Sequence, residues 1–246
     1  RGRQNAMNAV PEAVEYHLPF DASILMSVLA VGVIAAVSWL GTRRLEKVPR
    51  GWQNVLEWIL GIVYGFADDM VGPKAPKYYP LFAMLFLFIL VSNLMGLIPG
   101  FFSSTSRLST TLGLALVVFF ATHYFGVRER GVAAYVKHWF GPVPVWLKPF
   151  MFVIEVISEL ARPVSLSFRL FGNILAKEIL LAVLALLVFI FLPSGQLVQE
   201  ALSVVPLVLR PLIILLGVLV SVIQAFVFMI LAMVYIGGAV QAGEGH

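Results

Sequence analysis

Two very long apolar segments in the C-terminal half, residues 149–192 and about 202–240, constrain the fold more than any other feature. A helix needs only about 20 residues to cross the hydrocarbon core of a bilayer. Helices as long as these must tilt strongly, lie partly along the membrane, or be broken. Because proline removes a backbone donor, Pro206 and Pro211 predict a break near the start of the second helix.

The rest of the chain also predicts helices in a membrane. Of its 246 residues, 60% are hydrophobic and only 12% are charged, whereas soluble domains carry about a quarter charged residues. Residues 24–41 are expected to form a first span. Residues 81–98 and 110–125 are expected to form two more, which makes residues 81–125 a helical hairpin. The expected fold is therefore an all-α polytopic membrane protein with five membrane-crossing helices.

Residues 52–70 have a different pattern, which indicates a helix lying in the membrane interface. Apolar side chains recur at helical spacing on one face, and polar or small side chains on the other. The apolar face carries Val55, Ile59, Ile62, Phe66 and Met70, and the opposite face carries Asn54, Glu57, Gly61 and Asp68. Trp52 and Trp58 suit the level of the lipid headgroups.

The distribution of basic residues predicts the orientation. Lysine and arginine gather in the loops that follow the first and third spans, at Arg43, Arg44, Lys47, Arg50, Lys74, Lys77, Arg128, Arg130, Lys137 and Lys148. The opposite side has only Arg1, Arg3, Arg107 and Arg210. Since cytoplasmic loops are enriched in positive charge, we expect the N-terminus outside and the C-terminus in the cytoplasm. The pI near 9.5 is attributed to these loops, and no nucleic-acid partner is expected.

Several kinds of site find no support in the sequence. There is no cysteine, and no cluster of histidines or carboxylates has the spacing of metal ligands. There is also no glycine-rich loop followed by Lys-Ser or Lys-Thr, so no nucleotide site is expected. We therefore expect neither a metal nor a cofactor, and no catalytic site of an enzyme within this chain.

The segment 149–192 nevertheless carries Arg162, Arg169, Lys177 and Glu178. An uncompensated arginine at the bilayer centre costs roughly 3 kcal/mol on insertion scales, so such residues usually have a function. Helical spacing shows which of these charges have an acidic neighbour, because residues three or four apart lie side by side on a helix. Arg162 lies three residues after Glu159, which predicts a structural ion pair near the cytoplasmic interface.

Arg169 has no acidic neighbour one turn away in either direction; those positions hold Ser165, Leu166, Gly172 and Asn173. Its guanidinium stays protonated at any relevant pH. No other span offers a central carboxylate, so we infer a carboxylate partner on a different subunit. The alternative is an arginine buried against backbone carbonyls.

Other polar residues of the spans are candidates either for function or for structure. Glu178, in apolar surroundings, is a candidate to relay protons; the alternative is that it extends to the outer interface, as Lys177 is expected to do. Gln224, central in the last helix, is expected to bond Arg169, line a wet cavity or link helices. Asn93 is expected to link helices.

Three segments together resemble one known family. They are Arg162–Asn173 (RPVSLSFRLFGN), Ser92–Gly100 (SNLMGLIPG) and Gln224–Leu231 (QAFVFMIL). Their sequences and order are similar to those of subunit a in the membrane sector (F0) of F-type ATP synthases. The match extends from about residue 81 to residue 238.

This resemblance implies a stator subunit that translocates protons, with residues 149–240 forming a long tilted hairpin against a rotating ring of c subunits. Arg169 would face the ring carboxylate between two aqueous half-channels. Asn173, Glu178 and Gln224 would line or support the path, and Ser165 and Glu155 also match family positions. The implied partners are the c ring, the b subunits of the peripheral stalk and the lipid bilayer, most simply a bacterial inner membrane.

The sequence departs from part of the family at Gly217, where some bacterial relatives have a histidine. The outer half-channel is then expected to rely on Glu178 and water, with Gly217 leaving room. The sequence leaves H⁺ and Na⁺ open as the coupling ion. The alternative function is a self-contained secondary transporter in which Arg169 binds an anionic substrate. That reading predicts internal repeats, and no convincing repeat is present.

Overall fold

The structure is a computed structural model that describes residues 20–43, 45–98, 100–140, 144–191 and 197–241. Every element within these ranges is helical, as predicted. The α-helices are α2 (Phe20–Thr42), α3 (Trp52–Val71), α4 (Tyr79–Met95), α5 (Leu108–Arg130), α6 (Val132–His138), α7 (Lys148–Phe191) and α8 (Leu197–Gln241). Short 3₁₀ turns, η1 (Gly72–Lys77), η2 (Ser104–Ser106) and η3 (Val145–Leu147), lie between them.

Among the described residues, four helices are long and apolar enough to cross a membrane: α2, α5, α7 and α8. The expected second span is shorter than predicted, because α4 ends at Met95 and has 17 residues. It is about 26 Å long, against about 30 Å for a hydrocarbon core. Tight turns continue the chain, with Leu97 N donating to Leu94 O and Ile98 N to Met95 O. That α4 completes a fifth crossing stays a prediction.

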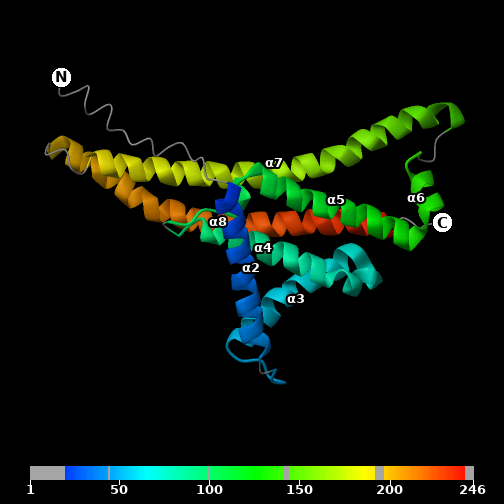
Figure 1. Cartoon of the computed structure of the whole chain (residues 1–246), viewed down its shortest axis with the longest axis horizontal. Helices are drawn as coiled ribbons and strands as arrows, with labels where there is room; N and C mark the ends of the chain where they lie inside the picture. The colour runs from blue at the N-terminus through cyan, green and yellow to red at the C-terminus, as the bar shows by residue number, and fades with distance from the viewer. Residues whose placement is uncertain (1–19, 44, 99, 141–143, 192–196, 242–246) are drawn as a thin grey trace.

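The two long helices dominate the molecule. Figure 1 shows α7 and α8 running antiparallel along its longest axis, with α2 crossing them at a steep angle. With 44 residues, α7 is about 66 Å long, twice the thickness of the hydrocarbon core. If α2 runs along the membrane normal, α7 and α8 must therefore be strongly tilted. This geometry supports the predicted tilted hairpin.

The predicted break in the last helix is wrong. α8 begins at Leu197 and continues through Pro206 and Pro211, and α7 likewise contains Pro163. A proline inside a helix removes one hydrogen bond and crowds the preceding turn. Membrane helices tolerate this because local adjustments and neighbouring groups satisfy the freed carbonyl.

The core surrounds the C-terminal half of α8, where one face is fully buried by α3, α4, α5 and α7. Its buried residues follow helical spacing: Ala225, Phe228, Met229, Ala232, Met233 and Ile236. Leu166, Leu170 and Ile174 of α7 and Phe82, Phe86 and Ile89 of α4 belong to the same cluster. In contrast, the N-terminal half of α8 leaves large apolar side chains such as Leu212, Leu215 and Leu219 exposed. That half therefore offers a surface to lipid or another subunit.

The expected interfacial helix corresponds to α3. Its protein-facing side is formed by Gln53, Leu56, Val63, Ala67 and Val71. Three members of the predicted apolar face, Val55, Ile62 and Met70, instead remain exposed, as do Trp52 and Trp58. The helix thus packs against the protein through one face and leaves apolar side chains on the other, as a helix in the interface requires.

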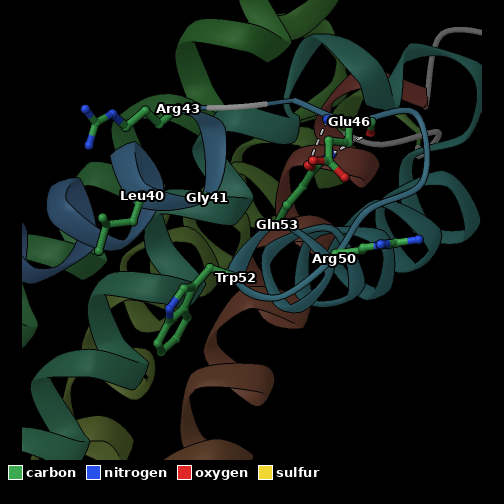
Figure 2. A pocket seen from close by; sticks show the side chains of 7 residues that line it. All are labelled: Leu40, Gly41, Arg43, Glu46, Arg50, Trp52 and Gln53. Carbon is green, nitrogen blue, oxygen red and sulfur yellow. Dashed lines mark hydrogen bonds between the residues drawn. The ribbon is translucent and has the colours of Figure 1, made fainter.

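A corner with a pocket of about 330 Å³ joins α2 to α3. Buried Gln53 holds it together: Glu46 N donates to Gln53 Oε1 at 3.0 Å, and Gln53 Nε2 donates back to Glu46 O at 3.0 Å. Figure 2 shows Arg43 and Arg50 on opposite sides, with their guanidinium groups pointing away from one another. The corner therefore fixes the direction of α2 without bringing its two arginines together.

The basic segment that follows the third span is partly helical where the structure describes it. It contains the end of α5, the short helix α6 and the turn η3. Tyr135 of α6 is buried, and its ring lies 5.9 Å from that of His123 of α5, between centroids. This segment therefore packs against α5.

Candidate functional site

Arg169 lies near the middle of α7, on its exposed side. Its neighbours Leu166 and Leu170 are buried in the core, which directs the guanidinium outward. Within the described part of the chain, no hydrogen-bond acceptor or carboxylate contacts this guanidinium. Phe168 and Val164, which flank it, are also exposed.

Small side chains line the exposed face of α7 on both sides of Arg169. They are Ser158, Ala161 and Ser165 before it and Gly172 and Ala176 after it, each three or four residues from the next member or from Arg169, and all are exposed. A Cβ added at Gly172 would meet no atom within 4 Å. Small residues at this spacing let another helix approach closely in a membrane. The cation thus stands in a shallow strip bordered by large apolar side chains.

One turn beyond Arg169, a side-chain hydrogen bond joins the two long helices. Asn173 Nδ2 donates to Gln224 Oε1 at 2.7 Å. Gln224 is buried, and its Nε2 has no partner among the described atoms. Sequence reasoning offered Arg169 as a partner for Gln224; the structure places Asn173 there instead.

Lys177 does not extend to the outer interface, so that prediction is wrong. Only 7% of the residue is exposed. Its Nζ donates to the backbone oxygen of Asn93 at 3.1 Å and to Ser221 Oγ at 3.4 Å. A buried cation without these oxygens would be very costly. The lysine therefore connects α4, α7 and α8 at one point.

Gly217 of α8 makes space for that lysine. A Cβ at this position would lie 3.1 Å from Lys177 Cδ and 2.7 Å from Leu97 Cδ2. The expectation that Gly217 leaves room beside Glu178 is therefore wrong, because the lysine stem and Leu97 occupy the space. A glycine inside a helix, as at Gly217, can indicate that a neighbouring side chain packs closely against the backbone there.

Glu178 is half-buried and faces the turn before η2. The backbone N of Ser103 donates to Glu178 Oε1 at 2.9 Å. Gly96 permits this approach, because a Cβ there would lie 2.9 Å from Ser103 N and 3.0 Å from Glu178 Oε1. The carboxylate thus has a fixed neutral donor.

Asn93 holds the turn that supplies this donor. Its Oδ1 accepts from Thr105 Oγ1 at 2.5 Å and lies 3.5 Å from Ser103 Oγ. Asn93 is fully buried, and its Nδ2 has no partner among the described atoms. Its amide therefore binds the turn, while its backbone oxygen links to α7 through Lys177. The sequence alone indicated neither Ser103 nor Thr105 as part of this polar network.

The ion pair expected near the other end of α7 is present. Arg162 Nη1 lies 2.6 Å from Glu159 Oε1. The same guanidinium lies 5.3 Å from the ring centroid of Tyr235 on α8. Both residues line a cavity of about 320 Å³ between α5, α6, α7 and α8, together with Glu155. Glu155 therefore shares one cavity with Glu159 and Arg162.

The polar groups of α7 thus lie on both sides of one exposed cation. Glu155 is fourteen residues before Arg169, about 21 Å along the axis, and Glu178 is nine residues after it, about 13 Å. The interval on the Glu178 side contains the Asn173–Gln224 hydrogen bond and the buried cation Lys177. The fold and this arrangement define a class: an integral membrane protein with polar groups distributed along one of its two longest helices.

Comparisons with known proteins give the particular family. Residues 24–237 match the family described as ATP synthase A chain. The chain is 44% identical over 235 residues to "ATP synthase subunit a 2" of Syntrophotalea carbinolica, covering 96% of this chain and 91% of the relative. It is also 44% identical over 218 residues to "ATP synthase subunit a" of Geobacter sulfurreducens, covering 89% and 86%. The chain belongs to the ATP synthase A chain family, which confirms the resemblance drawn from its motifs.

Proposed function

We propose that this chain is the proton-translocating stator subunit of the membrane sector of an F-type ATP synthase. One observation carries the proposal beyond family membership: Arg169 is exposed on an apolar face and has no acceptor among the described residues. An arginine at membrane depth requires a counter-charge. A carboxylate of a c-subunit ring, docked on the small-residue strip of α7, supplies it.

The guanidinium would act as a fixed charge on the rotor carboxylate. Its positive charge favours the ionised carboxylate, so a proton leaves the ring before the carboxylate passes Arg169 and another binds after it. Since arginine does not lose its own proton, it also blocks direct passage of protons from one side to the other. Rotation of the ring then couples proton flow to ATP synthesis.

Residues on the two sides of Arg169 would line separate half-channels. On the outer side we assign Asn173, Gln224 and Glu178; the Asn173–Gln224 hydrogen bond and the neutral donor on Glu178 support this assignment. Asn93 would support the turn that carries this donor. On the cytoplasmic side we assign Ser165, exposed on the strip, and Glu155 in its cavity.

The remaining assignments follow from family membership and charge. The partners are the c ring against α7 and α8, the b subunits of the peripheral stalk, and the other subunits of the synthase. The exposed face of α3 suits the headgroup layer of a bacterial inner membrane, with the N-terminus outside and the C-terminus in the cytoplasm.

A self-contained secondary transporter, with Arg169 binding an anionic substrate, is the alternative. Such transporters place discontinuous helices around the substrate, whereas α7 and α8 run without interruption past Arg169 and Gln224. The exposed position of Arg169 also favours a partner chain over an enclosed small anion.

Replacement of Arg169 tests the proposal in the complete synthase. Arg169→Ala should abolish ATP-driven proton pumping and proton-driven ATP synthesis in proteoliposomes while the complex still assembles. Arg128→Ala, which removes an exposed arginine at the end of α5, serves as the control and should leave both activities intact. Full coupled activity of Arg169→Ala would refute the assignment, and solute uptake by the purified chain alone would favour the transporter.

A further inference from the structure

The cavity between α5, α6, α7 and α8 contains more chemistry than a structural ion pair requires. Its volume of about 320 Å³ corresponds to about ten waters at their liquid volume. Its polar lining consists mainly of Arg130, Tyr135, Glu155, Glu159, Arg162 and Tyr235. Glu155 and Glu159 are four residues apart, so their carboxylates share one face of α7. Two carboxylates thus face one space large enough for water.

The two carboxylates have different surroundings. Glu159 is only 8% exposed and is paired with Arg162, whose guanidinium also lies over the Tyr235 ring. Glu155 is more exposed and has no hydrogen bond or ion pair with any described residue. Glu159 therefore has a fixed cationic partner, whereas Glu155 has none and faces the cavity.

The other charged and titratable groups around Glu159 come from α5, α6 and α8. Arg130 of α5 donates through Nη2 to the Gly238 oxygen of α8 at 2.5 Å, so its charge is directed to the backbone. Burial, followed by the nearby Glu159 carboxylate, raises the pKa of Tyr135 on α6. Tyr135 therefore stays a neutral hydroxyl beside Glu159 at physiological pH. The charged and titratable groups around Glu159 are then Arg130, Tyr135, Glu155, Arg162 and Tyr235.

We propose that this cavity is a hydrated proton-exit chamber and that Glu159 is a second proton-carrying carboxylate in it, positioned by Arg162. The inference rests on the proposed function of the chain and adds Glu159 and Arg162 to the cytoplasmic half of the path. A proton arriving by water adds to a Glu159 oxygen, which becomes a neutral acid, while Arg162 keeps its charge. The proton then passes by water to the Glu155 carboxylate and from there to the cytoplasm. The steps reverse when the enzyme hydrolyses ATP.

Distance and charge both favour a relay of this kind. Glu155 lies about 21 Å along the axis from Arg169, and Glu159 lies about 15 Å from it. Water must therefore carry the proton between the ring and the cavity, and a carboxylate at the near end shortens that path. The Arg162 charge stays beside Glu159 throughout, because arginine does not lose its proton, and the ion pair holds the Glu159 side chain at the cavity.

Paired substitutions in the complete synthase test the proposal. Glu159→Gln keeps the shape and removes the titratable group, whereas Glu159→Asp keeps it. Passive proton conduction through the membrane sector, measured in proteoliposomes against the pH on the cytoplasmic side, should fall about tenfold in Glu159→Gln, equivalent to about 1.4 kcal/mol on the limiting step. Glu159→Asp should recover most of the conduction with a shifted pH profile. Glu46→Gln, an exposed glutamate of the α2–α3 corner, is the matched control and should conduct like the wild type.

The outcomes separate a proton carrier from a structural pair. Unchanged conduction in Glu159→Gln would overturn the proposal. Equal losses in the Gln and Asp variants, with an unchanged pH profile, would also overturn it, because a merely structural pair predicts that result. If Glu159→Gln fails to assemble, the pH profile of Glu159→Asp decides alone, and an unshifted profile counts against the proposal. Arg169→Ala, measured in parallel, reports separately on the proposed function.

Discussion

The packing of Lys177 against Gly217 makes a quantitative prediction. Gly217→Ala would place a Cβ 2.7 Å from Leu97 Cδ2 and 3.1 Å from Lys177 Cδ. The first distance is about 1 Å inside the optimal separation of two carbons. Forcing a methyl group into a packed site costs about 1–3 kcal/mol, partly offset by about 1 kcal/mol because alanine is the better helix former.

A matched control isolates the steric part of this change. Gly113→Ala in α5 gains the same helical propensity, and its Cβ would meet nothing within 4 Å. Gly113→Ala should therefore slightly raise the free energy of unfolding of the purified synthase. Gly217→Ala should have a free energy of unfolding about 1–3 kcal/mol lower than that of Gly113→Ala. Thermal unfolding of the detergent-solubilised complex measures both variants.

The double variant Lys177→Ala/Gly217→Ala tests the contact itself. Shortening the lysine removes its 3.1 Å contact with the new methyl group, although the 2.7 Å contact with Leu97 remains. The two substitutions should therefore be less harmful together than the sum of their separate effects. Coupling between contacting residues is typically about 0.5–3 kcal/mol. If the effects add to within about 0.5 kcal/mol, the two residues do not share this space and the account of Gly217 is wrong.

Two further predictions concern the turn before η2 and Glu178. Gly96→Ala would crowd Ser103 N and Glu178 Oε1, so it should lengthen or break their hydrogen bond and slow proton conduction. ATP hydrolysis by the detached catalytic sector should be unaffected. Normal proton conduction in Gly96→Ala would refute this prediction. Glu178→Gln should slow proton flux through the assembled complex, since an amide cannot relay protons, and the Ser103 contact remains possible to its carbonyl oxygen. Wild-type flux in a fully assembled Glu178→Gln complex would return Glu178 to a structural role.

The helices and their charged residues were predictable from sequence because both follow from local patterns. Length and hydropathy predicted α2, α5, α7 and α8, since helical hydrogen bonds are made within each segment. Helical spacing predicted the Arg162–Glu159 pair and the absence of an acidic neighbour around Arg169. These inferences required only one helix at a time.

Contacts between helices were not predictable in the same way. Lys177 was expected at the interface because a long lysine side chain in a membrane helix usually extends its ammonium group to water. Its oxygen partners lie on α4 and α8, 84 and 44 positions away in sequence. The same holds for Ser103 and Glu178, 75 residues apart. The break predicted at Pro206 and Pro211 was wrong for another reason. The rule that proline breaks a helix describes helices in water-soluble proteins and is weaker in a membrane.

Proximity between Arg169 and a carboxylate on another chain is the central claim, and cysteine cross-linking tests it most directly. The chain contains no cysteine, so a single thiol can be introduced on α7 and paired with one placed a turn away from the ring carboxylate. Gly172→Cys, on the exposed strip one turn from Arg169, should form a disulfide with the ring subunit under mild oxidation, whereas Leu170→Cys, buried in the core, should not. No cross-link from Gly172→Cys in a fully assembled synthase, or an equal yield from Leu170→Cys, would contradict the account.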